Sequence, residues 1–167
     1  MRVIFLDVDG VLNSRVHNNM CKKDETSELY INESMAKRLS KLYTKFNDTI
    51  LVLSSDWKEV PSSNYDLLEQ KLGEYGIEIF GRTAIVNSNR NRPQEIKRWL
   101  KTHKGLNIDY WVSLDDDYDY KDYDLAEYGF SNHLCKTEFR KLEDKIDDTG
   151  FTNLKYHVAL EILEGIY

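Results

Sequence analysis

Asp7 and Asp9, one residue apart, follow a short apolar run near the start of the chain. Side chains alternate along an extended backbone, so both carboxylates are expected to point to the same side. Two such charges repel each other unless a cation or a shared proton lies between them. Gly10 then permits a tight turn out of the strand. The spacing therefore predicts that a group binds at this strand end.

Two later apolar runs also end in side chains that could take part in chemistry. Residues 49–55, TILVLSS, end in two serines, and residues 111–117, WVSLDDD, end in three aspartates. Arg92 lies between these runs, just ahead of an expected helix. Carboxylates gathered from separate strands form a site of hard oxygen ligands, which suits a Mg²⁺ ion that keeps part of its water shell.

The elements that must position these residues form an alternating pattern. Helical stretches separate short apolar runs at 3–6, 49–55, 77–80, 111–114 and 133–135. Strands that alternate with helices indicate right-handed crossovers and a parallel sheet between helical layers. The sequence therefore predicts a three-layer, Rossmann-like α/β fold with a central parallel sheet of about five strands, which binds its ligand at the carboxyl ends of the strands.

Four helices are expected from apolar residues at helical spacing. The first should begin behind a cap at Asn32, the third with Pro93 as its first residue, and the last behind Asn153. The residues expected to face the core are Met35, Leu39, Leu42, Tyr43, Phe46, Tyr65, Leu68, Leu72, Ile96, Trp99, Leu100, Leu154, Val158 and Ile162.

Two polar stretches follow neither the helical nor the strand period. Residues 14–31 come directly after the first strand and are expected to form a loop, either a small flap over the ligand site or a solvated segment without a role. Residues 115–124, DDDYDYKDYD, are expected to form a solvated acidic loop after their first two aspartates.

Composition limits the class of protein. The 167 residues suit one domain over 1–167, and 23 basic against 29 acidic residues give a net charge of −6, which argues against broad electrostatic binding to nucleic acid. Cys21 and Cys135 form no metal or redox pattern and are expected to be reduced thiols of a cytoplasmic protein, with Cys135 in the core. No apolar run is long enough for a signal peptide or a membrane span, and the oligomeric state is left open.

Several of these segments resemble the motifs of the haloacid dehalogenase (HAD) superfamily of phosphohydrolases. FLDVDGVLN at 5–13 resembles the first motif, LVLS at 51–54 the second, and WVSLDD at 111–116 the fourth. The third motif is a Lys or Arg near a helix start, and Arg92 is its best match, with Arg90 and Lys97 as alternatives. The order and spacing of the four motifs make the resemblance specific. Residues 14–31 and the connection after Ser54 are both too short for a large cap domain, so a minimal cap or none is expected.

A closer resemblance is to the small HAD domains associated with RNA-repair proteins. It rests on LSSDWK at 53–58, RPQEIKRWL at 92–100 and the three aspartates at 115–117. The chain departs from that pattern with Lys58 in place of Arg and Pro93 in place of Gly, which weakens any transfer of substrate. Trp57, within the first of these segments, could stack on a base, line the cleft or pack in the core.

The resemblance implies a role for each acidic residue. Asp7 would be the nucleophile that forms an aspartyl phosphate, and Asp9 the general acid and base. Mg²⁺ would be held by the carboxylates of Asp7 and Asp116 and by the main-chain carbonyl of Asp9. Asp115 would hold the arginine of the third motif.

The remaining roles concern the phosphoryl group. Ser54 would donate a hydrogen bond to a phosphoryl oxygen, and Ser55 is the alternative because a shift of one residue exchanges the two. Arg92 would neutralise phosphate charge.

The expected function is that of a Mg²⁺-dependent phosphomonoesterase, acting on a phosphorylated small molecule such as a nucleotide or on a nucleic-acid end. A phosphotransferase would use the same residues and differ only in the acceptor. A catalytically silent binding or regulatory module is the third reading, and the presence of both Asp7 and Asp9 opposes it.

Overall fold

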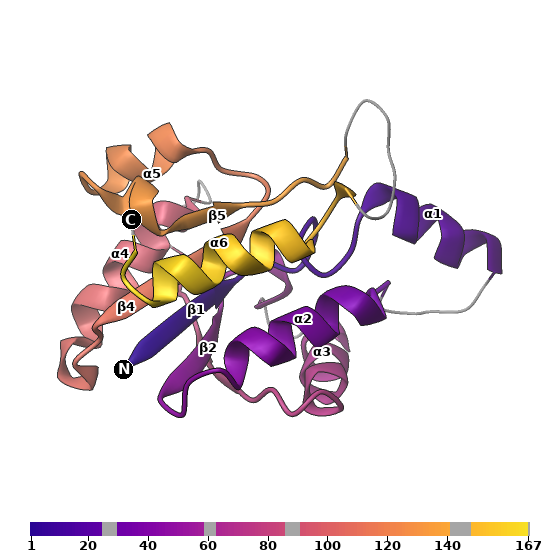
Figure 1. Ribbon diagram of the computed structural model, residues 1–167, viewed down its shortest axis with the longest axis horizontal. Coiled ribbons are helices and arrows are strands. Elements are labelled where there is room, and N and C mark those ends of the chain that lie inside the picture. The colour runs from indigo at the N-terminus through magenta and orange to yellow at the C-terminus, as the bar shows by residue number, and fades with distance from the viewer. Residues whose placement is uncertain (25–29, 59–62, 86–90, 141–147, 167) are drawn as a thin grey trace.

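Five parallel strands form one sheet in the order β3-β2-β1-β4-β5 (Figure 1). The computed structural model describes residues 1–24, 30–58, 63–85, 91–140 and 148–166. The strands are β1 (Arg2–Leu6), β2 (Thr49–Leu53), β3 (Ile79–Arg82), β4 (Tyr110–Asp115) and β5 (Leu134–Lys136). The predicted parallel sheet is confirmed, although β3 begins two residues later than the apolar run at 77–80.

Helices cover both faces of the sheet, which confirms the predicted three layers (Figure 1). They are α1 (Arg15–Asp24), α2 (Glu33–Tyr43), α3 (Ser63–Gly73), α4 (Arg92–Thr102), α5 (Tyr120–Ala126) and α6 (Asn153–Leu163), with short 3₁₀ turns η1 (Asp56–Lys58), η2 (Lys104–Leu106) and η3 (Phe130–His133). Buried residues of α2, α3 and α6 pack with one face of the sheet. Those of α4 and α5 pack with the other.

The helix starts agree with the sequence to within one residue. The side chain of Asn32 caps α2 by accepting from the Met35 N–H, as predicted. Helix α4 begins at Arg92, one residue before Pro93, because Asn91 supplies its cap. Thr152, not Asn153, caps α6.

One residue assigned to the core of α6 is wrong. Leu154 is 70% exposed, whereas Tyr156, Ala159, Ile162 and Leu163 are buried. The buried stripe of α6 therefore starts later along the helix than the predicted spacing implies.

The expectation that residues 14–31 lack helical structure is wrong, because α1 occupies Arg15–Asp24. The Ser14 hydroxyl accepts the His17 N–H at the start of this helix, and the Cys21 Sγ lies 3.4 Å from His17 Nε2 one turn on. The helix is predominantly polar, with Val16, Met20 and Cys21 as its only apolar residues, so hydrophobic patterning gives it a weak signal. Residues 25–29 lie outside the described residues, and the role of the segment as a flap stays a prediction.

The acidic stretch at 115–124 is not a loop throughout, because α5 begins at Tyr120. Asp119 caps this helix by accepting from the backbone N–H of Asp122, whose carboxylate accepts the Asp119 N–H in return. Acidic residues at a helix start are stabilised by the helix dipole. Two aspartates of the run that suggested a solvated loop, Asp119 and Asp122, therefore form a helix cap.

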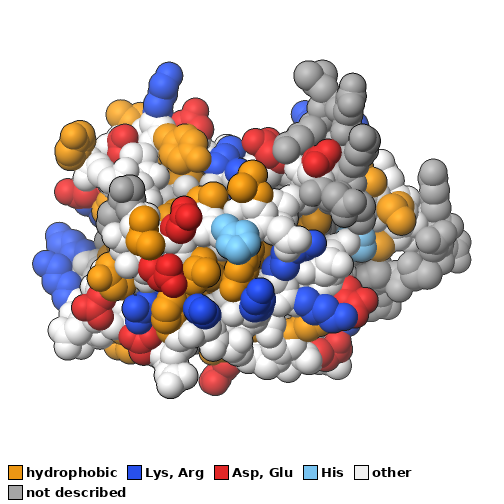
Figure 2. Space-filling view, in the orientation of Figure 1, with side chains coloured by type: hydrophobic (Ala, Val, Ile, Leu, Met, Phe, Trp, Pro, Cys, Tyr) orange, Lys and Arg blue, Asp and Glu red, His pale blue; other side chains and the backbone are white. Residues whose placement is uncertain are grey.

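The surface over α2 and α6 mixes charge types. Lys and Arg side chains alternate there with Asp, Glu and apolar side chains in the described part of this face (Figure 2). Neither cysteine forms a disulfide and both are buried, with Cys135 fully buried as predicted. None of the described helices combines the length and the apolar character that crossing a bilayer requires.

Candidate active site

The strand register brings Asp7, Ser54 and Asp115 to one edge of the sheet. Leu6, the last residue of β1, is in register with the last residue of β2 and with the residue before the end of β4. The next residue along the chain is Asp7 after β1, Ser54 after β2 and Asp115 at the end of β4. Because parallel strands end at a common edge, three residues far apart in sequence become neighbours.

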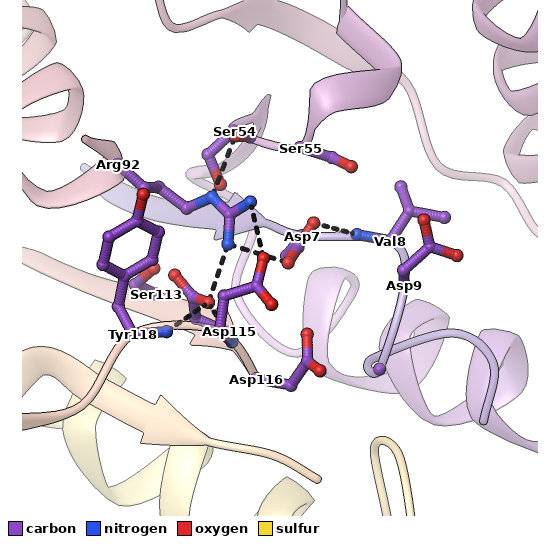
Figure 3. A network of polar contacts seen from close by, with 12 residues as sticks. Asp7, Val8, Asp9, Ser54, Ser55, Arg92, Ser113, Asp115, Asp116 and Tyr118 are labelled. Atoms are coloured by element: carbon purple, nitrogen blue, oxygen red, sulfur yellow. Dashed lines mark hydrogen bonds and ion pairs between the residues drawn. The ribbon is translucent and has the colours of Figure 1, made fainter. Parts of the chain in front are cut away.

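Arg92 joins these three strand ends. Its Nη1 donates to Asp7 Oδ2 at 2.8 Å and to Asp115 Oδ1 at 2.7 Å, and its Nε donates to the Ser54 carbonyl at 3.1 Å (Figure 3). The side chains of Arg92, Asp7 and Asp115 are 6%, 4% and 0% exposed, so these charge-assisted bonds form out of water. Of the two alternatives, Lys97 donates to the Ala126 carbonyl instead, and Arg90 lies outside the described residues.

Asp115 is held by α5 as well as by Arg92. The Tyr123 hydroxyl donates to Asp115 Oδ2 at 2.9 Å and lies 2.6 Å from the Ser113 hydroxyl. The backbone N–H of Asp117 donates to Asp115 Oδ1. Tyr123 was not identified from the sequence because its segment was read as a loop. Asp119 and Asp122, three residues apart, form the cap of α5, and this spacing is the sequence signal that could have placed Tyr123 on a helix.

Asp7, Asp115 and Asp116 form an acid cluster whose nearest carboxylate oxygens all lie within 4.8 Å of one another. Burial raises the pKa of Asp7 to about 7, against the effect of Arg92, which lowers it. Burial, with Asp7 as the next contribution, raises the pKa of Asp116 to about 8. The pKa of Asp115 is also raised by burial. Three carboxylates beside one guanidinium leave an excess of negative charge, which a divalent cation with oxygen ligands would offset.

The two serines after β2 lie in different surroundings. The Ser54 hydroxyl is buried and has no hydrogen-bond partner among the described residues. Hydrogen bonding by the Ser55 side chain lowers the pKa of Asp7, so that hydroxyl lies beside the carboxylate. Both therefore stay candidates for the group that contacts a phosphoryl oxygen, Ser54 because its bonding capacity is unused and Ser55 because it is beside Asp7.

Asp9 is exposed, and its carboxylate lies outside the acid cluster. Its Oδ2 accepts from Trp57 Nε1 at 2.8 Å, and its Oδ1 accepts from Asn13 Nδ2 at 2.8 Å. In Figure 3 it lies on the far side of Val8 from Asp7. The sequence did not predict the Trp57 contact, because a bond between segments 48 residues apart has no local signal.

Two cavities border the acid cluster. One, of about 170 Å³, lies on the Arg92 side and is lined by Ser54, Asp56, Lys58, Arg92, Glu95, Asp117 and Tyr118. The other, of about 540 Å³, lies on the Asp116 side and is lined by Asp116, Asp117, Glu138, Phe139 and Arg140. The strand ends are therefore accessible to a ligand larger than a metal ion.

Replacing Gly10 with alanine should disrupt the cluster. Gly10 has a φ of +71°, and a Cβ there would overlap the Asp116 carboxylate. The positive φ alone costs a non-glycine residue about 1–2 kcal/mol, and displacement of Asp116 adds a loss of function. We expect Gly10→Ala to lower both the melting temperature and the activity, measured by thermal unfolding and by phosphate release.

Gly76→Ala is the matched control for this variant. Gly76 has nearly the same φ, +72°, and a Cβ there meets nothing within 4 Å. It should lower the melting temperature without reducing activity in the remaining folded protein. Equal activity of the two variants would contradict a role for the close approach of Gly10 to Asp116.

Comparison with known proteins agrees with this geometry. Residues 3–143 match the family model described as "HAD domain in Swiss Army Knife RNA repair proteins". No curated protein and no solved structure matched. The matched segment runs from β1 past β5 and includes the whole acid cluster and Arg92, which supports an activity of the phosphatase or phosphotransferase type. The chain belongs to the family of HAD domains in Swiss Army Knife RNA repair proteins.

Proposed function

We propose that this chain is a Mg²⁺-dependent phosphomonoesterase that works through an aspartyl phosphate on Asp7. The observation that carries the proposal is the position of Asp7, which is buried, paired with the Arg92 guanidinium and within 4.8 Å of the other two carboxylates of the acid cluster. A carboxylate in a turn or a helix cap requires neither an arginine nor two further aspartates. A carboxylate that attacks a phosphoryl group requires nearby positive charge, which Arg92 and a cation bound by the acid cluster would supply.

The side chains supply each step of the reaction. An oxygen of Asp7 forms a bond to phosphorus while the bond from phosphorus to the leaving oxygen breaks. Asp9 gives its proton to that oxygen and later takes one from the water that hydrolyses the aspartyl phosphate. Arg92 and a serine hydroxyl, of Ser54 or Ser55, bind the phosphoryl oxygens. Val8 N–H and Arg92 Nη1 each donate to a different oxygen of Asp7 and so orient it.

The donor set fits a magnesium ion. The carboxylates of Asp7 and Asp116 and the main-chain carbonyl of Asp9 would hold it, while Asp115 remains engaged with Arg92 and Tyr123. When bound, Mg²⁺ offsets the repulsion between the Asp7 carboxylate and the phosphoryl oxygens.

A nucleotide or a nucleic-acid terminal phosphate is the proposed substrate. The family description names RNA repair, and the cavity of about 540 Å³ beside Asp116 has room for a leaving group with Phe139 and Arg140 on its wall. An aromatic ring and a guanidinium are groups on which a base can stack.

A panel of phosphomonoesters tests the proposal. Mononucleotides and oligonucleotides phosphorylated at the 3′ or 5′ end are incubated with Mg²⁺ or with EDTA, and released phosphate is measured. We expect release only with Mg²⁺ and highest for one of the nucleotide classes. An added alcohol acceptor distinguishes transfer from hydrolysis. No release from any ester with Mg²⁺ present would contradict the proposal.

The stability of the metal-free protein should fall as pH rises from about 4 to 8. Asp7 and Asp116 have pKa values raised to about 7 and about 8, so between their ordinary value of 3.8 and these values the folded chain binds protons that the unfolded chain has lost. The free energy of unfolding then decreases with pH in that window. Mg²⁺ should raise the melting temperature at pH 8, because it binds the ionised carboxylates of the folded state.

The control for this prediction is Asp116→Asn. It should have a flatter dependence of melting temperature on pH and a smaller response to Mg²⁺. A wild-type melting temperature that rises from pH 5 to pH 8 without metal would contradict the assigned burial of these carboxyls.

A further inference from the structure

The Asp9 carboxylate accepts hydrogen bonds from Asn13 and Trp57, two residues that have no other role in the proposed reaction. Trp57 Nε1 donates to one of its oxygens and Asn13 Nδ2 to the other, each at 2.8 Å. An exposed aspartate normally samples several rotamers, and two donors on separate elements restrict it to one. Each carboxylate oxygen has a second lone pair, so the group can still carry or accept a proton.

The orientation of the Asn13 amide is determined by its surroundings. Asn13 is fully buried, and its Oδ1 accepts the backbone N–H of Gly10 at 3.0 Å. A backbone N–H can only donate, so the Asn13 oxygen must face Gly10 and its NH₂ group must face Asp9. The same side chain thus joins the tight turn after β1 to the Asp9 carboxylate.

Trp57 comes from the neighbouring strand exit. It lies in η1, three residues after Ser54, and its ring is half-buried against the main core cluster. The packed ring gives the indole N–H a defined position, and that N–H bridges from the end of β2 to the loop after β1. The bond lies at an exposed position where water could also accept from this N–H, so its contribution is to orient the Asp9 carboxylate.

We propose that Trp57 is a positioning residue that, together with Asn13, holds the Asp9 carboxyl for proton transfer to the leaving oxygen. This inference rests on the proposed function and adds to it a residue that does not touch the reacting atoms. When the bond from phosphorus to the leaving oxygen breaks, the proton on Asp9 moves to that oxygen and Asp9 becomes a carboxylate. A misplaced carboxyl makes that transfer less frequent without changing how phosphate binds.

Trp57→Phe tests the inference with two kinds of ester. The variant keeps an aromatic ring and removes the N–H. For an alkyl phosphate, whose leaving alkoxide needs a proton, we expect kcat/KM to fall about tenfold. That loss is smaller than the whole contribution of general acid catalysis, about 10²–10⁴-fold, because Asp9 itself remains. For p-nitrophenyl phosphate, whose leaving phenolate is stable without a proton, kcat/KM should stay within about twofold. A purely structural effect would lower both values equally.

Two further variants isolate the path through Asp9. In an Asp9→Asn background, Trp57→Phe should cause no additional loss of kcat/KM, because the group it positions is gone. Trp99→Phe is the matched control. Trp99 lies in α4 and its ring packs on Phe5 and His103, so both esters should react as with the wild type.

Indole N–H signals in a ¹H–¹⁵N NMR spectrum test the contact without activity. The chain has 3 tryptophans, and the signal lost in Trp57→Phe identifies Trp57. Asp9→Asn should shift that signal and leave the other two in place. An unmoved Trp57 signal, or equal or increased kcat/KM of Trp57→Phe on alkyl phosphates, overturns the inference alone. A wild-type chain that hydrolyses neither ester overturns the proposed function and this inference with it.

Discussion

Replacing Asp7 with asparagine is expected to reduce phosphomonoester turnover about 10⁴-fold or more, as the loss of a nucleophile does in other enzymes with covalent intermediates. The amide has nearly the shape of the carboxylate but does not attack phosphorus. The variant should remain folded, because Arg92 keeps its bonds to Asp115 and to the Ser54 carbonyl. Steady-state kinetics and circular dichroism together measure the two expectations.

Asp117→Asn is the matched control for Asp7→Asn. Asp117 belongs to the same run of acids, but its side chain is 65% exposed and lies 3.7 Å from Arg92 Nη2. Its replacement should leave turnover within a few-fold of the wild type. If Asp7→Asn retained a tenth of the wild-type rate, Asp7 would not be the attacking group.

Replacing Lys58 with methionine is expected to destabilise the fold more than any surface change. Lys58 and Glu95 form an ion pair with side chains 5% and 2% exposed, and Lys58 Nζ also donates to Thr83 Oγ1 and the Ser54 carbonyl. Loss of one partner leaves a buried charge unpaired, which costs about 3–5 kcal/mol. For a chain of this size the melting temperature should fall by about 6–20 °C, measured by thermal unfolding.

A second variant and an exposed pair complete this test. The double replacement Lys58→Met and Glu95→Leu should recover much of the lost stability, because no buried charge remains. Lys37→Met removes one partner of an i, i+4 pair with Glu33 that is 64% and 69% exposed, and should hardly move the melting temperature. A Lys58→Met melting temperature close to the wild type would show that Glu95 finds another partner or a proton.

The Lys58–Glu95 pair also bears on the site. The Ser54 carbonyl accepts from both Lys58 Nζ and Arg92 Nε, so the ion pair supports the strand end that carries the candidate serines. Lys58 was visible in the sequence only as a departure from the family pattern. Its contact with Glu95 joins η1 to α4, and nothing in either segment alone specifies it.

The sequence by itself determined the sheet and the two strand ends that supply the acid cluster, but it paired Asp7 with Asp9, whose carboxylate lies outside that cluster. Apolar runs that end in Asp7, Ser54 and Asp115 predict parallel strands. Parallel strands with right-handed crossovers have their carboxyl ends at one edge of the sheet, independent of the conformation of the loops. The helix cap at Asn32 is equally local. The proline at position 93 placed Arg92 next to the start of α4, within one residue of where the helix begins.

Only the tertiary structure decided how these side chains are held. The bonds from Trp57 to Asp9 and from Lys58 to Glu95 join segments distant in sequence, and the bond from Tyr123 to Asp115 joins α5 to the end of β4. Helices α1 and α5 were missed because α1 is predominantly polar and α5 is a short helix within an acidic run. Hydrophobic patterning is a local property that the chain repeats every few residues, whereas a polar contact depends on where two separate backbones come to lie. The order of the elements could therefore be read in advance. Of the buried charge pairs, the one between Arg92 and Asp115 was expected from the family resemblance, and the one between Lys58 and Glu95 was not.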